Sequence, residues 1–84
     1  MIHIAYTGAT LQQLHDFVGN DSKAPQRLTM AQNHIQNWVL ENAASWQLHS
    51  NHNHTDVIGF TVTAQLATIA QNGDRTVNIT HFQA

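Results

Sequence analysis

The chain has 84 residues, with three Lys or Arg, five Asp or Glu and seven His, and its formal net charge is −2 at pH 7 with the histidines neutral. Cysteine is absent, which excludes disulfides, thiolate metal ligands and a thiol nucleophile. Binding to nucleic-acid phosphates needs several cationic side chains, so this composition argues against strong nucleic-acid binding at neutral pH. We expect a single domain over residues 1–84, because a chain of this length builds one small core.

No segment approaches the roughly 18 apolar residues of a membrane span, and the chain begins without the basic residues and long apolar run of a signal peptide. We therefore expect a soluble, cytoplasmic protein with no membrane partner. Protonation of the seven His would change the formal charge from −2 to +5. An anionic partner would then be bound better in acid than at pH 7.

The first part of the chain predicts a strand and a short helix. Residues 2–6 alternate apolar side chains with His3 and Ala5, the period of a half-buried strand. Thr10 and Gln13 have the spacing of a capping box, and apolar residues follow at helical spacing. Gly19 is a residue type that commonly ends a helix, so we expect the first helix to end there.

A second, longer helix is predicted after a polar connection over residues 20–26. Pro25 suits the first turn of a helix, and Thr29 with Gln32 repeats the capping-box spacing. The apolar side of this helix, which we expect to run to about Gln47, consists of Leu28, Ala31, Ile35, Trp38, Val39, Ala43 and Trp46. Two tryptophans on one side indicate that this side packs against the core.

Polar residues 49–55 predict a loop, and residues 57–70 and 75–82 predict two strands. Both predicted strands are rich in β-branched residues. Gly59 is a point at which the first of them can bulge or divide. A helix over residues 63–71 is the alternative, and the β-branched residues favour the strand.

The segment between these strands, residues 71–74, contains Asn-Gly, the pair that favours a two-residue type I′ turn. This turn would place Leu66 opposite Ile79 and Ala64 opposite His81. One face of the hairpin is then apolar and the other polar, and a one-residue slip would reverse the two faces. His81 is expected on the apolar face.

The expected order of elements is β-α-α-β-β, which gives an α+β fold with two helices packed on one face of a small antiparallel sheet and a long C-terminal hairpin. In this order, and in the segments 4–7, 11–14 and 76–82, the chain resembles the small RelE/ParE-type toxin fold. That resemblance implies a ribonuclease toxin with Arg75 and His81 as its site residues. The opening segment also looks like the start of small uncharacterised phage proteins.

The densest group of candidate metal ligands is His49, His52, His54 and Asp56. If this segment is extended, the last three project to one side, where they could hold Zn²⁺, Ni²⁺ or Cu²⁺. A metal-binding module is therefore one alternative function. His15 with Asp16, and His34, fall on predicted helices without a facing partner and give no acid–base pair.

No carboxylate pair, nucleophile motif or Gly-rich phosphate loop is present. We therefore expect a non-enzymatic protein-binding domain without a cofactor, encoded by a phage or mobile element, that acts by occluding a partner's surface. The polar Gln, Asn and Thr side chains of the hairpin suit a wet interface with another protein or with a second copy. The RelE-like ribonuclease and the metal-binding module are the alternatives.

Overall fold

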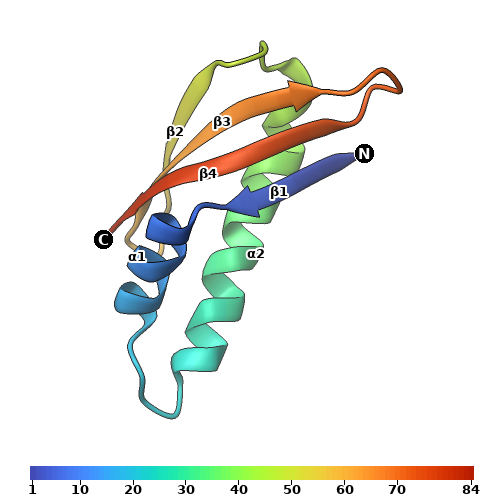
Figure 1. Cartoon of the computed structure of the whole chain (residues 1–84). Coiled ribbons are helices and arrows are strands. Elements are labelled where there is room, and N and C mark those ends of the chain that lie inside the picture. The colour runs from blue at the N-terminus through green and yellow to red at the C-terminus, as the bar shows by residue number, and fades with distance from the viewer.

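The computed structural model describes residues 1–84 and has the element order β-α-α-β-β-β. Its elements are β1 (Ile2–Tyr6), α1 (Gly8–Val18), α2 (Ala24–Asn42), a 3₁₀ turn η1 (Ala43–Ser45), β2 (Asn51–Thr55), β3 (Thr61–Ile69) and β4 (Arg75–Gln83). The strands form one sheet in the order β1-β4-β3-β2. Both helices lie on one side of it (Figure 1), which confirms the α+β prediction. The sheet is mixed rather than antiparallel throughout as predicted, because β1 is parallel to β4 while the other neighbours are antiparallel.

Both helices begin earlier than their predicted capping boxes. The N-cap of α1 is Thr7, whose hydroxyl accepts a hydrogen bond from the Thr10 amide, and Thr10 itself is buried inside the helix. Thr29 also lies within its helix, where its hydroxyl donates to the Pro25 carbonyl. The C-terminal ends of the helices are closer to expectation. Gly19 follows the last residue of α1 and has a φ of 77°. The second helix continues from α2 through η1 and ends at Ser45.

One cluster of buried apolar side chains joins the helices to the sheet. The predicted apolar side of the second helix is buried as far as Trp46, with Ala31, Ile35 and Val39 in α2, Ala43 in η1 and Trp46 after it. The strands β3 and β4 supply Val62, Ala64, Leu66, Val77, Ile79 and Phe82. Neither helix has the length and apolar character needed to cross a bilayer.

The predicted loop over residues 49–55 is wrong for most of its length, because Asn51–Thr55 forms β2. The predicted strand from residue 57 is also wrong at its start, since β3 begins at Thr61. Between them, the Asp56 amide donates to the Phe60 carbonyl, and Gly59 has a φ of 105°. Residues 57–59 therefore form the loop of a hairpin between β2 and β3, with Gly59 at the position that needs a positive φ.

The second hairpin differs from its predicted two-residue turn. The Ala70 amide donates to the Asp74 carbonyl, and the Gly73 amide donates to the Ala70 carbonyl. Of the loop residues only Gly73 has a positive φ, of 93°. This is a three-residue loop over residues 71–73, of the same kind as the loop between β2 and β3. A type I′ turn would have required a positive φ at Asn72 as well.

The predicted register of this hairpin is also wrong, although its faces are correct as far as Ile79. Leu66 lies opposite Val77, and Ile79 lies opposite Ala64. The shift is two residues, so these apolar side chains remain on the buried face. A bulge at Thr80 then reverses which residues of β4 face the core. The predicted placement of His81 on the apolar face is therefore wrong, since Phe82 is buried and His81 is exposed opposite Thr63.

Candidate functional site

The polar strand β2 places two imidazole rings against the end of the helix layer. His52 and His54 alternate with exposed residues and face α2 and η1. The ring of His52 stacks on Trp46 with centroids 4.1 Å apart, and the ring of His54 stacks on Trp38 at 5.1 Å. The segment predicted as a loop is therefore extended, as the metal-binding alternative required, and indole rings cover the side to which His52 and His54 point.

Asp56 joins this strand to α2. Its side chain is only 6% exposed, and its two carboxylate oxygens lie 2.9 Å from His34 Nδ1 and 3.1 Å from His54 Nε2. The Ile58 amide donates a third hydrogen bond to the same group. Burial by itself would raise the pKa of Asp56, but the hydrogen bonds from Ile58, His54 and His34 and the charge of His34 outweigh it and hold the pKa below its ordinary value.

These contacts define which ring nitrogens carry protons. An ionised carboxylate only accepts hydrogen bonds, so His34 donates from Nδ1 and His54 donates from Nε2. The remaining nitrogens, His34 Nε2 and His54 Nδ1, are available as bases when the rings are neutral. His34, His54 and Asp56 line a hollow of about 220 Å³ together with Asn37, Trp38 and Glu41. Chemically, this cluster can take up and release protons.

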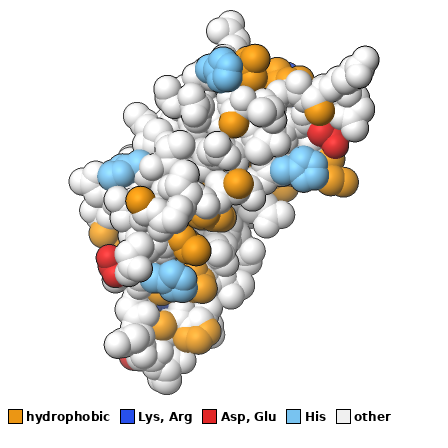
Figure 2. Space-filling view, in the orientation of Figure 1, with side chains coloured by type: hydrophobic (Ala, Val, Ile, Leu, Met, Phe, Trp, Pro, Cys, Tyr) orange, Lys and Arg blue, Asp and Glu red, His pale blue; other side chains and the backbone are white.

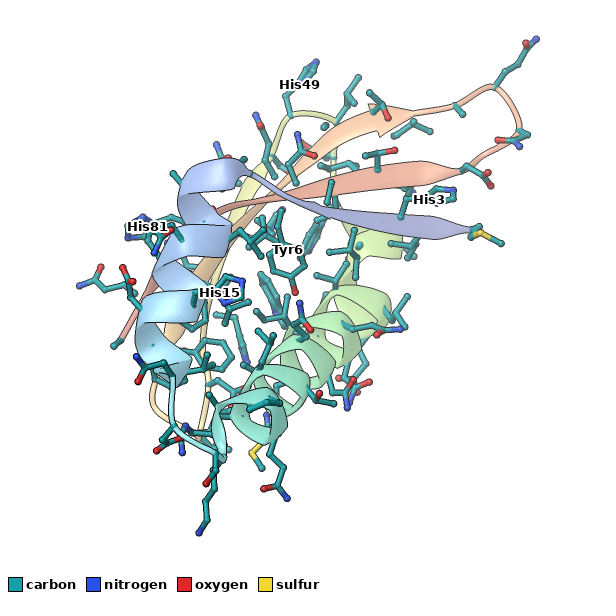
Figure 3. All side chains as sticks on the ribbon, turned by 60° about the horizontal axis from the view of Figure 1, so that its bottom comes forward. His3, Tyr6, His15, His49 and His81 are labelled. Atoms are coloured by element: carbon teal, nitrogen blue, oxygen red, sulfur yellow. The ribbon has the colours of Figure 1, made fainter.

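The structure separates the four predicted metal ligands. His54 and Asp56 lie together, while His52 Nε2 lies 2.8 Å from the Ser50 hydroxyl. His49 lies in the preceding loop, where it is exposed and has a φ of 66° (Figure 3). No group of three or more His, Asp or Glu side chains converges with the arrangement of a metal site.

The two residues predicted for a ribonuclease site lie at opposite ends of β4. They are six residues apart in the strand, a separation of roughly 20 Å. The Arg75 guanidinium donates to the Ala43 and Trp46 carbonyls at the end of the helix layer. His81 is exposed and lies near Gln83. These two residues therefore do not form one site.

Sequence reasoning missed His34, which it placed on a helix without a partner. The available signal was its spacing, because His34 lies three residues after the buried Ala31 and four before Trp38. That position is at the border of the apolar side of α2. Its partner Asp56 could not be identified from this spacing, since the contact depends on how β2 packs against α2.

A second surface lies at the opposite edge of the sheet, along β1. The Met1 carbonyl and the Thr7 amide bond to β4, at Arg75 and Ile79. Main-chain groups of successive residues in a strand point to alternate sides, so His3 and Ala5 also point to β4. The N–H and C=O groups of Ile2, Ile4 and Tyr6 therefore point to the free edge.

Beside this edge runs a groove of about 350 Å³ between β1 and α2, which we call the β1 groove. It is lined by Ile2, Ile4, Tyr6, Gln32, Asn33, Gln36 and Leu40. Tyr6 points from β1 toward α2 (Figure 3), and burial raises its pKa to about 12. The lining contains no Lys, Arg, Asp or Glu, so the groove combines apolar side chains with neutral amides and a protonated hydroxyl.

The two edges of the sheet are covered differently. On β2, the row formed by His52 and His54 is stacked under Trp46 and Trp38. On β1, the three apolar side chains that face the helix layer are only half-buried. The β1 edge therefore has both free main-chain groups and incompletely covered apolar side chains.

Comparisons with protein families, with curated proteins and with solved structures find no match to this chain. The RelE/ParE-type resemblance stays a prediction from the order of elements and the segments that suggested it.

Proposed function

We propose that this chain is a non-enzymatic protein-binding domain that takes up an extended segment as an additional strand on β1. The observation that supports this proposal is the free edge of Ile2, Ile4 and Tyr6 beside the uncharged β1 groove. In strand addition, main-chain hydrogen bonds supply affinity, and pockets for alternate side chains supply specificity. The domain would act by occluding the bound segment.

The energetics of such an interface are favourable but modest. Each strand-to-strand hydrogen bond contributes a net of about 0.5–1.5 kcal/mol. Apolar side chains of the added strand would cover the half-buried faces of Ile2, Ile4 and Tyr6, and each Å² of apolar surface removed from water contributes roughly 25 cal/mol. A charged side chain pointing into the groove would lose hydration without gaining a partner, so the bound segment is uncharged on that side.

The ribonuclease alternative has less support. Metal-free cleavage of RNA needs cationic groups that stabilise the charge of the transition state. Arg75 bonds to main-chain carbonyls and lies far along β4 from His81. The cluster of His34, His54 and Asp56 offers proton transfer, but the residues that line its hollow include no Lys or Arg.

Site-specific photo-crosslinking in the native host tests the proposal. A photoreactive amino acid at Gln36, which is exposed on the rim of the β1 groove, is expected to capture a protein. The same group at Asn51 on β2, at the other sheet edge, is the matched control and is expected to capture nothing.

Capture from Gln36 should also depend on the apolar lining of the β1 groove. Ile4→Lys places an inward-pointing charge in the groove and should abolish capture from Gln36, with folding checked by circular dichroism. Equal capture from Asn51 and Gln36, or capture that persists in the Ile4→Lys variant, would contradict the proposal.

A further inference from the structure

We infer that the segment bound at the β1 edge is β1 of a second copy of this chain, in an antiparallel arrangement about a two-fold axis at Ile4. This inference rests on the proposed strand addition and names its occupant. Its starting point is that β1 has both requirements of a strand for this groove, which are main-chain groups free on the correct side and an uncharged apolar row facing the helix layer.

The main-chain match is complete in one register. With Ile4 opposite Ile4 of the second copy, Ile2 lies opposite Tyr6, and all three residues have their N–H and C=O groups on the free edge. In an antiparallel pair, opposite residues that both point inward exchange two hydrogen bonds. Three such pairs form, so every outward N–H and C=O group of Ile2, Ile4 and Tyr6 in both copies finds a partner.

Neighbouring registers match less well. Moving one copy by a single residue would place His3 or Ala5, whose main-chain groups already bond to β4, opposite an outward-pointing residue. Moving it by two residues leaves terminal groups unpaired. The register centred on Ile4 is therefore the one that satisfies this edge.

The side chains agree with the main-chain register. A two-fold axis perpendicular to the sheet places both helix layers on the same face and joins the two β1 grooves. Ile2, Ile4 and Tyr6 of each copy then cover the same residues of the other. Neither copy brings a Lys, Arg, Asp or Glu into this space, so no charge is buried without a partner.

The resulting assembly extends each four-stranded sheet into a continuous sheet of eight strands with β1 and its mate at the centre. The β1 edges disappear, and the outer edges of the assembly are the two β2 strands. These are short and polar, properties that limit further edge-to-edge association. A closed dimer is therefore the expected end of assembly.

Sedimentation equilibrium measures the dimer directly. The wild-type chain is expected to have twice the monomer mass, and Gln36→Lys, which adds one charge to the exposed rim of each groove, is expected to weaken association by at least about tenfold. Asn51→Lys on β2 adds the same charge at the other edge and should leave the dimer unchanged. A monomeric wild-type chain at the concentrations used for NMR would overturn the inference.

The register has its own test, because the chain contains no cysteine. The residues of a hydrogen-bonded antiparallel pair have Cα atoms about 5.5 Å apart, within the range of a disulfide. Ile4→Cys should therefore give an oxidised covalent dimer, and Asn53→Cys at the centre of β2 should not. Crosslinking through Asn53→Cys alone would show that β2 is the interface and would overturn the inference.

These outcomes separate the inference from the proposed function. A monomer that still captures a different protein from Gln36 keeps the binding function and rejects the second copy. A monomer that captures nothing rejects both.

Discussion

Asp56 uses almost every polar group it has to hold three parts of the chain together. Its amide donates to the Phe60 carbonyl, and its carbonyl accepts from Gly59, which closes the loop between β2 and β3. Its carboxylate accepts hydrogen bonds from His34 on α2 and from His54 on β2. Loss of its charge would therefore loosen the edge strand and the helix contact together.

We predict that Asp56→Asn lowers the free energy of unfolding by about 2 kcal/mol at neutral pH, because hydrogen bonds to a buried charged group are stronger than those to an amide. The folded-state pKa of Asp56 lies below the unfolded value of about 3.9, so its contribution is present above that value and is lost as the pH falls through the folded pKa. Urea unfolding across this range should show the two proteins converging in acid.

Asp16→Asn is the matched control, because Asp16 is exposed and bonds only to Gln12 on its own helix. Its effect should stay within about 0.5 kcal/mol. A difference between the wild-type chain and Asp56→Asn that does not narrow below about pH 4 would contradict the role assigned to the carboxylate.

Part of the candidate site could be predicted from the spacing of single residues in the sequence. The spacing of His52, His54 and Asp56 would place them on one side if the segment were extended. The structure has His52 and His54 on one side of β2, with Asp56 bonded to His54. The spacing could not predict that His34 joins them, because that contact links residues 22 positions apart through the packing of two elements. The free edge of β1 was equally hidden, since it depends on which strand pairs with β4.

Among the elements, β4 shows how a single bulged residue decides which side chains face the core. Before Thr80 the odd-numbered Val77 and Ile79 are buried, and after it Phe82 is buried while His81 is exposed. The Phe82 amide donates to the Gln13 side chain on α1, which fixes the strand after the bulge. A regular hairpin would place His81 inside and leave Phe82 in solvent.

We predict that Phe82→Ala destabilises the fold by about 3–5 kcal/mol, because Phe82 is 2% exposed and stacks against Phe60 with centroids 4.8 Å apart. His81→Ala should change stability by no more than about 0.5 kcal/mol. Chemical denaturation of both variants measures the difference. The opposite ranking would show that the strand lacks the bulge.

The alternation of apolar and polar residues predicted the faces of the strands but not their register. Alternation of apolar and polar residues indicated the correct faces for Leu66 and Ile79, and these are buried as expected. Alternation repeats every two residues, so it cannot distinguish registers that differ by two. β2 was missed because its five residues, Asn51–Thr55, lack the apolar half of the pattern, which is supplied by tryptophan rings from the helix layer.

Across the whole molecule, the surface has little charge of either sign. Lys and Arg are almost absent from the face shown in Figure 2, and its histidines are spaced apart. Two of the three cationic side chains are already engaged, Arg27 with Asp21 and the Val18 carbonyl, and Arg75 with main-chain carbonyls. Lys23 alone is left for an anionic partner at neutral pH.

We predict that a single-stranded RNA oligonucleotide binds weakly at about pH 7.5 and is not cleaved, because too few counterions are released at so few cationic contacts. Binding should strengthen in acid, at about pH 5, because protonated imidazoles add positive charge to the surface. Fluorescence anisotropy measures both conditions. Tight binding at neutral pH, or cleaved RNA that His81→Ala prevents, would support the ribonuclease alternative.

The pairing of β1 with β4 has a consequence for how the molecule is made. The first strand of the chain lies beside the last, so Ile4 meets Val77 only after more than seventy intervening residues have been synthesised. Contacts this distant in sequence slow folding, because a long loop must close before they form. Until β4 has left the ribosome, β1 is an apolar segment with both edges unpaired. Nascent chains should therefore be most prone to mispairing at β1, whose partner β4 is synthesised last.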